Sequence, residues 1–386
     1  MYDFDEIIDR HGSHCAKWDD VGKELLPMWV ADMDFKSAPE IIAALEERVR
    51  HGVFGYSGGC AVWDDSLIGW MNRRWGWEVK REWIFPSPGV VPALDMLVRA
   101  LARPGEGVII QTPVYPPFFR VVTRNGRRLR ENPLQYDGRR YIMDLENLER
   151  QIDANTKLLI LCSPHNPVGR VWSREELTAL GEICLRHGIT VIADEIHSDL
   201  VFSGYRHTVF ASLGPEFEQI CAVCNAPSKT FNLAGIQASN VIIPNRRIRS
   251  AYRDVLDTGE LGLPNVFAVA ALEAAYSRGE PWLEEMLAYV EGNYRFARGF
   301  IEQRIPEIKV VQAEGTYLLW LDCRGLGLST LELDRFIREK ARLVLSPGTI
   351  FGSSGSGFQR MNIGCPRALV EEGLQRLEAA AHDRDI

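Results

Sequence analysis

Short, continuous apolar runs recur through the middle of the chain, with amphipathic segments between them. The runs lie at residues 108–110, 158–161, 191–193, 220–223 and 241–243. Continuous apolar character is typical of strands in parallel sheets, because helices cover both faces of such sheets. The pattern therefore predicts an α/β fold with a mostly parallel central sheet.

A helix is predicted between two of these strands. Ser173 and Glu176 have the spacing of a capping box, and Gly188 is placed to end the helix. The apolar positions between them repeat at helical spacing at Leu177, Leu180, Ile183 and Cys184. Strand, helix and strand in this order build a right-handed crossover, and ligands of such sheets bind outside the carboxyl ends of the strands.

The two ends of the chain have a different pattern. Residues 282–304 have the periodicity of a long amphipathic helix, residues 316–320 that of a strand, and residues 366–381 that of a final helix. We therefore expect a second, smaller α+β domain. The expected division is a large domain of residues 46–281 and a small domain built from residues 1–45 and 282–386.

Composition and charge argue against some classes of function. The 386 residues are 46% hydrophobic, which suits a globular protein of about two domains. The net charge of −8 argues against nucleic acid or an anionic membrane as the main partner, because both require clustered Lys and Arg. One basic run at residues 124–130 is interpreted as a solvated strand–turn edge.

Targeting signals are not evident. Residues 1–6 lack the basic and apolar regions of a signal peptide, and no apolar run approaches the roughly 20 residues that span a membrane. The eight cysteines are scattered, so a disulfide framework is not implied. We expect a cytoplasmic protein.

Three polar segments follow predicted strands. They contain Asn166 in an Asn-Pro-x-Gly turn, Asp194 directly after a strand, and Lys229 in an otherwise uncharged segment. Each has a simpler interpretation alone: a turn, a helix N-cap and a surface lysine, respectively. A buried lysine would instead have a depressed pKa, and its neutral amine could form a covalent bond with an aldehyde.

Taken together, the three segments resemble the fold-type I pyridoxal 5′-phosphate (PLP) enzymes of the aminotransferase superfamily. The resemblance covers nearly the whole chain and is strongest to the MalY/PatB group of cystathionine β-lyases, also called C–S lyases. The segments that carry it are residues 29–35, 52–56, 88–93, 113–118 and 227–232. It implies the fold-type I architecture, with PLP as cofactor.

The resemblance also implies a role for individual residues. Lys229 holds PLP covalently and moves the Cα proton, Asp194 pairs with the pyridine nitrogen, and Tyr115 stacks on the ring. Asn166 and His197 lie at the phenolic oxygen. Arg360 binds the substrate α-carboxylate, with Asn166 and Tyr56 also in contact with the substrate.

The phosphate of PLP requires hydrogen-bond donors. The amides of Val90 and Val91 begin a predicted helix and point at an anion there, and Ser228 adds a hydroxyl. Tyr56 would reach the phosphate from a second subunit, so the resemblance implies a homodimer with shared active sites. Gln237 stands where many aminotransferases have Arg, which makes this phosphate site less cationic.

No metal site is predicted. Cys221 and Cys224 have metal-ligand spacing, but alternation on a strand would place them on opposite faces. The cluster at residues 11–15 lacks carboxylates.

The predicted activity is α,β-elimination of cystathionine or another S-substituted cysteine, giving a thiol, pyruvate and ammonia. An aminotransferase on the same fold is the leading alternative, since both reactions begin with removal of the Cα proton. An alternative of another class is a regulatory protein that binds a transcription factor, a second role described for some lyases of this group.

Overall fold

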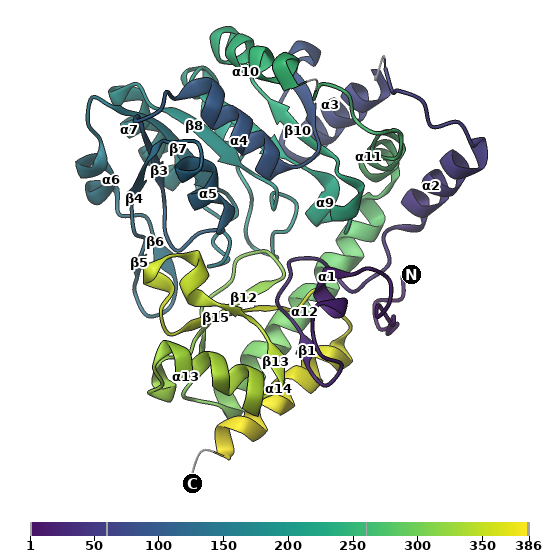
Figure 1. The fold of residues 1–386 in the computed structure, drawn as a ribbon, viewed down its shortest axis with the longest axis vertical. Coiled ribbons are helices and arrows are strands. Elements are labelled where there is room, and N and C mark those ends of the chain that lie inside the picture. The colour runs from purple at the N-terminus through teal and green to yellow at the C-terminus, as the bar shows by residue number, and fades with distance from the viewer. Residues whose placement is uncertain (1, 59–60, 260, 384–386) are drawn as a thin grey trace.

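A seven-stranded sheet forms the centre of the computed structural model, which describes residues 2–58, 61–259 and 261–383 (Figure 1). In spatial order its strands are β2 (Ile84–Ser87), β10 (Ser239–Ile242), β9 (Cys221–Asn225), β8 (Thr190–Asp194), β7 (Thr156–Cys162), β3 (Gly107–Ile110) and β4 (Arg128–Glu131). Strand β10 alone is antiparallel to its neighbours β9 and β2. The predicted α/β fold with a mostly parallel sheet is confirmed.

Two hydrophobic cores cover the two faces of this sheet. Helices α4 (Val90–Leu101), α5 (Pro117–Thr123) and α10 (Arg246–Gly259) bury their apolar sides against one face. Helices α3 (Ala61–Trp75) and α7 (Arg174–His187) contribute to the core on the other face. Alternation along β9 divides its side chains between the cores, so Cys221 faces one and Cys224 the other, as predicted.

Helix α7 has the ends that the sequence predicted. The Ser173 side chain accepts a hydrogen bond from the Glu176 amide, and the Glu176 carboxylate accepts one from the Ser173 amide. The helix ends at Gly188, which has a φ of 65° that glycine adopts without steric cost. These local contacts fix the crossover from β7 to β8.

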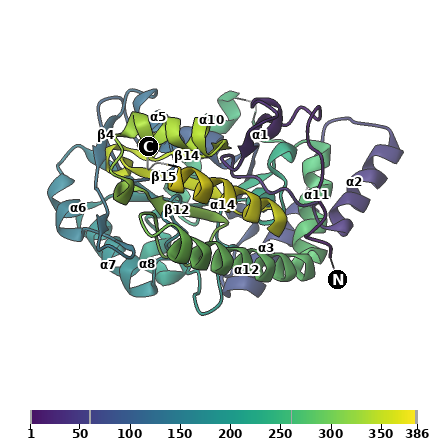
Figure 2. The same ribbon diagram turned by 90° about the horizontal axis from the view of Figure 1, so that it is seen from below.

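A second, four-stranded antiparallel sheet lies beside the first. Its order is β11 (Lys309–Val310), β12 (Leu318–Asp322), β15 (Phe358–Asn362) and β14 (Ser346–Pro347). Helices α12 (Glu280–Arg304) and α14 (Arg367–His382) run side by side over it (Figure 2). The strand predicted at residues 316–320 begins two residues later, because Thr316 has a φ of 68° and its amide donates to Leu200 O.

The two ends of the chain meet in this region. Strand β1 (Leu26–Pro27) pairs in parallel with β13 (Leu343–Val344). Helix α2 (Pro39–His51) crosses the predicted boundary at residue 46 and packs against α11 (Val266–Arg278). The domain boundaries themselves stay a prediction.

The remaining short α-helices and strands are α1 (Ala16–Asp19), β5 (Gln135–Tyr136), β6 (Tyr141–Ile142), α6 (Leu145–Gln151), α8 (Pro215–Glu218), α9 (Pro227–Thr230) and α13 (Thr330–Arg335).

Two sequence expectations concern the protein surface: the lack of a membrane span and the basic run at residues 124–130. Within the described ranges, no helix has both the length and the apolar character that crossing a membrane requires. The basic run at residues 124–130 leads into β4, the outermost strand of the large sheet, as its interpretation as a strand edge required. Charged side chains on an edge strand discourage pairing with other chains.

Candidate active site

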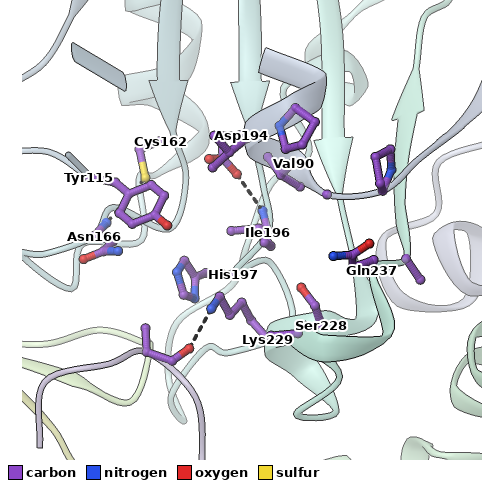
Figure 3. A pocket seen from close by; sticks show the side chains of 17 residues that line it. Val90, Tyr115, Cys162, Asn166, Asp194, Ile196, His197, Ser228, Lys229 and Gln237 are labelled. Carbon is purple, nitrogen blue, oxygen red and sulfur yellow. Dashed lines mark hydrogen bonds between the residues drawn. The ribbon is translucent and has the colours of Figure 1, made fainter. Parts of the chain in front are cut away.

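A cavity of about 180 Å³ lies where the strands of the large sheet end. The loops that follow β2, β3, β7, β8 and β9 all contribute side chains, because the carboxyl ends of these five strands meet at one edge. Every predicted site residue except Tyr56 and Arg360 lines the cavity: Val90, Val91, Tyr115, Asn166, Asp194, His197, Ser228 and Lys229 (Figure 3). The predicted clustering of these side chains is therefore observed.

Lys229 extends into the cavity from the short helix α9. Its Nζ donates a hydrogen bond to Ala31 O at 2.6 Å (Figure 3). Burial of the amine lowers the pKa of Lys229 to about 8, although the nearby carboxylate of Asp32 acts to raise it. An appreciable fraction of the amine is therefore neutral near physiological pH, which is the form that attacks an aldehyde.

Asp194 occupies the other end of the cavity, at the end of β8. Its Oδ1 accepts a hydrogen bond from the Ile196 amide at 3.2 Å. Burial raises the pKa of Asp194 to about 7, and the neighbouring charge of Glu195 acts in the same direction. The negative charge of this buried carboxylate is only weakly balanced by its surroundings, so the site suits a cationic partner. The protonated nitrogen of a pyridine ring has the required charge.

His197 lies between these two groups. Burial, together with the charges of Lys229 and Arg360, lowers the pKa of His197 to about 3, so the ring is neutral. Its Nδ1 is buried and has no hydrogen-bond partner within the described part of the chain. Unpartnered buried polar atoms are costly, so this nitrogen fits a ligand that offers a polar atom in the cavity.

Arg360 reaches the site from β15 of the second sheet. Its guanidinium donates to Asn166 Oδ1 at 3.1 Å and to Trp29 O at 2.7 Å. Burial lowers the pKa of Arg360 to about 10, and among the described residues no carboxylate pairs with it. A buried guanidinium without a counter-ion fits the two-pronged binding of a substrate carboxylate.

The part of the cavity at the start of helix α4 is suited to an anion. Helix α4 begins at Val90, and its N-cap residue Gly89 has no side chain to occupy the first amides. Those amides and the positive end of the helix favour a phosphate. Ser228 and Gln237 also line this cavity. The residues present therefore fit PLP: an amine, a carboxyl for the ring nitrogen and donors for the phosphate.

Residues 29–35 form an irregular segment beside the cavity, which Ala31 lines, and we call this segment the strap. Its carbonyl oxygens are held by side chains from distant elements. Asn232 Nδ2 donates to Met33 O and Phe35 O, both at 2.9 Å. Asn362 Nδ2 donates to two more strap carbonyls, and Tyr317 Oη donates to Ala31 O at 3.1 Å. The strap thus contacts both Lys229 and Arg360.

Sequence reasoning missed several of these groups. The roles of Asn362 and Tyr317 in holding the strap were not predicted, since no local pattern marks either residue. Cys162 also lines the cavity, and its buried thiol has a pKa well above the usual value, mainly because of desolvation. This thiol is therefore protonated, and it acts as a small apolar wall.

Tyr56 does not join the cavity of its own chain. Its side chain is fully exposed. The role predicted for it at a neighbouring subunit's phosphate stays a prediction, as do the individual roles of the cavity residues.

Comparisons with known proteins agree with this geometry. The sequence profile of the aminotransferase class I and II family matches residues 30–377. PatB, a cystathionine β-lyase of Bacillus subtilis, is 48% identical over 98% of this chain and 99% of its own length. Protein MalY of Escherichia coli is 34% identical over 98% of both chains.

Solved structures that resemble this chain are likewise PLP enzymes. Cystalysin from Treponema denticola, which contains PLP, is 39% identical with a TM-score of 0.96 over 99% of each chain. The PLP-bound C–S lyase of Staphylococcus hominis is 32% identical with a TM-score of 0.93 and covers 100% of each chain. These likenesses confirm the family that the motifs indicated. The chain therefore belongs to the aminotransferase class I and II family, and PatB is among the members that it resembles over nearly its whole length.

Proposed function

We propose that this chain is a PLP-dependent C–S lyase of the cystathionine β-lyase type. The observation that carries the proposal is the cavity that holds both the amine of Lys229 and the buried carboxyl of Asp194. Solved structures that this chain resembles contain PLP. The names of PatB and of the Staphylococcus hominis enzyme support elimination at a carbon–sulfur bond. This is the activity that the sequence motifs predicted.

Four groups would hold the cofactor. Lys229 would bind its aldehyde carbon covalently, Asp194 would pair with its ring nitrogen, and the first amides of α4 with Ser228 would bind its phosphate. Tyr115 lies along the cavity wall, where its ring can stack on that of the cofactor. When bound, PLP supplies an electron sink for the charge left at Cα after deprotonation.

The chain's own residues would place and deprotonate the substrate. Arg360 would bind the α-carboxylate, and its contact with Asn166 fixes the orientation of the guanidinium relative to the cavity. The Lys229 amine, with its depressed pKa, can take the Cα proton once the substrate has displaced it. Loss of the thiolate from Cβ would release a thiol and leave aminoacrylate, which water then hydrolyses to pyruvate and ammonia.

Product analysis tests this proposal against the aminotransferase alternative. Purified protein reconstituted with PLP is incubated with cystathionine in the absence of any keto acid. We expect pyruvate and free thiol to form in equal amounts over many turnovers. Turnover that requires an added keto acid, with no thiol released, would overturn the proposal and support an aminotransferase.

We also propose a homodimer with shared active sites. Large apolar side chains that are exposed in the single chain gather in two segments, at Val53, Phe54, Tyr56, Leu261 and Leu263. Exposed apolar surface of this kind suits an interface with a second copy. Tyr56 would then reach the partner's phosphate site.

Subunit mixing tests the shared site. A hybrid of a Tyr56→Phe subunit and a Lys229→Ala subunit has one site with both native groups if Tyr56 acts across the interface. We expect mixing to restore activity to well above that of either variant. No recovery despite hybrid formation would contradict the shared site.

Location is the final part of the proposal. The cysteines of the described residues are free, and all except Cys15 are buried. Reduced thiols are typical of the cytoplasm, which supports cytoplasmic location.

A further inference from the structure

A buried ion pair joins the two sheets away from the cavity. Arg170 Nε donates to Glu314 Oε2 at 2.8 Å, and the two side chains are 3% and 2% exposed. Arg170 belongs to the loop that follows β7, and Glu314 lies just before β12 of the second sheet. Neither residue is among those that line the cavity. Any effect of this pair on the chemistry must therefore act through other residues.

The loop after β7 ties Arg170 to Asn166. His165 and Arg170 form an antiparallel bridge, in which the His165 amide donates to Arg170 O at 2.8 Å. Asn166 lies within the turn that this bridge closes. The Arg170 guanidinium also donates to both carboxylate oxygens of Glu176, at 2.9 and 2.8 Å, near the start of α7. Arg170 is thus fixed to the same part of the molecule as Asn166.

Glu314 ties the second sheet to this loop. Its Oε2 also accepts a hydrogen bond from the Val171 amide at 2.9 Å, and its own amide donates to Gly169 O at 2.8 Å. Strand β12 follows and pairs with β15, which places Trp320 opposite Arg360 (Figure 1). Glu314 is therefore connected through two paired strands to the arginine that reaches the cavity.

The contact between Arg360 and Asn166 closes this circuit. The guanidinium of Arg360 donates to Asn166 Oδ1 at 3.1 Å, so the two sheets are joined once at the cavity and once at the buried ion pair. A buried ion pair contributes little net stability, because the cost of removing both charges from water offsets their attraction. It does require a defined geometry of its two partners.

We propose that Arg170 and Glu314 form a positioning pair that fixes Arg360 relative to Asn166 and so shapes the binding site for the substrate α-carboxylate. The inference rests on the proposed function, because it requires Arg360 to bind that carboxylate. Without the charge of Glu314, the second sheet loses a directional contact with the loop after β7. The guanidinium of Arg360 can then shift relative to Asn166, and even a small displacement of a binding group weakens binding.

A purely structural role is the alternative, in which the pair only stabilises the packing of the two sheets. Glu314→Gln keeps the shape and an acceptor for the Val171 amide but loses the charge. Glu176→Gln is a matched control, since it removes a carboxylate from the same arginine. Gln can keep the capping box of α7, and the link between the sheets remains.

The test compares the binding of two probes to protein reconstituted with PLP. L-Alanine has the amino and carboxylate groups of a substrate but no leaving group on Cβ, and ethylamine lacks the carboxylate. Both probes change the absorbance of PLP when they displace Lys229 from it, so titration gives a Kd for each. We expect Glu314→Gln to raise the Kd of L-alanine roughly tenfold and to change that of ethylamine by less than about twofold. Glu176→Gln should match wild type with both probes.

A second comparison asks whether the pair acts through Arg360. In an Arg360→Lys background, we expect Glu314→Gln to weaken L-alanine binding by less than about twofold. The same tenfold loss in that background, equal losses for L-alanine and ethylamine, or an equal effect of Glu176→Gln would each overturn the inference.

Circular dichroism checks that each variant is folded. Glu314→Asp keeps the charge but shortens the side chain, and we expect its Kd for L-alanine to lie between those of wild type and Glu314→Gln. This variant decides the question if Glu314→Gln does not fold: a rise in the Kd of L-alanine alone supports the inference, and unchanged binding overturns it.

These measurements also separate two failures. Wild-type protein that takes up no PLP, or that releases no thiol from cystathionine, would contradict the proposed function. Wild-type protein that binds L-alanine more tightly than ethylamine, with the same preference in Glu314→Gln, would contradict only the role of the ion pair.

Discussion

Two clusters of charge contact the strap, and they are built in opposite ways. In the first, Lys17 Nζ lies 2.5 Å from Asp34 Oδ2, and Arg10 pairs with both Asp32 and Asp34 at 2.7 and 2.6 Å. Burial acts to raise the pKa of Asp34, but Lys17 and the other donors outweigh it and the pKa is lowered. Each charge in this cluster has an opposite charge as its partner, as a structural ion pair requires.

The second cluster is the cavity. Burial shifts Lys229, Asp194 and Arg360 towards their neutral forms, to pKa values of about 8, 7 and 10. None of the three forms an ion pair within the described part of the chain. Buried charges that the protein leaves uncompensated mark the place where a charged ligand completes the site. The comparison thus distinguishes a cluster that stabilises the fold from one that is prepared for chemistry.

The strongest test of this distinction is Lys229→Ala. Under the proposed function the amine would both hold the cofactor and move the Cα proton, so we expect lyase activity to fall by roughly 10³-fold or more. The fold should remain, since no buried partner loses its counter-ion. Steady-state pyruvate release and circular dichroism measure the two effects. Lys157→Ala, which removes a half-buried lysine that does not line the cavity, is expected to keep wild-type activity.

Replacing Arg360 tests the substrate end of the cavity. Arg360→Lys keeps the charge but loses the forked geometry that matches a carboxylate, so we expect kcat/KM to fall by roughly 100-fold. Arg324→Lys is a suitable control, because that arginine is exposed and pairs with Asp322. An Arg360→Lys enzyme with unchanged kcat/KM for cystathionine would remove Arg360 from the carboxylate site.

The first cluster should respond in stability instead. Lys17→Met leaves the buried Asp34 with one fewer cation, and we expect it to lower the free energy of unfolding by about 3 kcal/mol. Lys36→Met breaks an exposed pair with Glu6 and is expected to cost less than about 1 kcal/mol. Denaturant unfolding measures both. Equal losses in the two variants would show that the first cluster is no more important to the fold than a surface pair.

The last test concerns the pH dependence of the cofactor-free protein. The pKa of Asp194 is raised from 3.8 to about 7, so the folded protein binds more protons than the unfolded chain between about pH 4 and 7. The contribution of Asp194 to stability is therefore lost as the pH rises through this window. Asp194→Asn should make the fall in unfolding free energy shallower. The remaining slope is expected from Asp199, whose pKa burial raises to about 6.

Local patterns in the sequence were sufficient to predict the elements and the loops that carry chemistry. The capping box at Ser173 and Glu176 and the glycine at 188 act within a few residues, so they could be identified without the fold. Asn166, Asp194 and Lys229 were found because each follows a buried strand, and the ends of parallel strands meet at one edge. The family resemblance supplied the cofactor, and the comparisons agree with it.

Only the tertiary structure decided which distant groups meet. Arg360 and Asn166 are 194 residues apart, and their contact depends on how the second sheet packs against the first. The hydrogen bonds of Asn232 to the strap and the pairing of Glu195 with His207 are likewise invisible in any short window of sequence. The antiparallel direction of β10 follows from its pairing with β9 and β2, since an apolar run has the same composition in either direction. Periodicity and capping are local properties of the chain, whereas burial, charge compensation and convergence arise only when separate elements pack together.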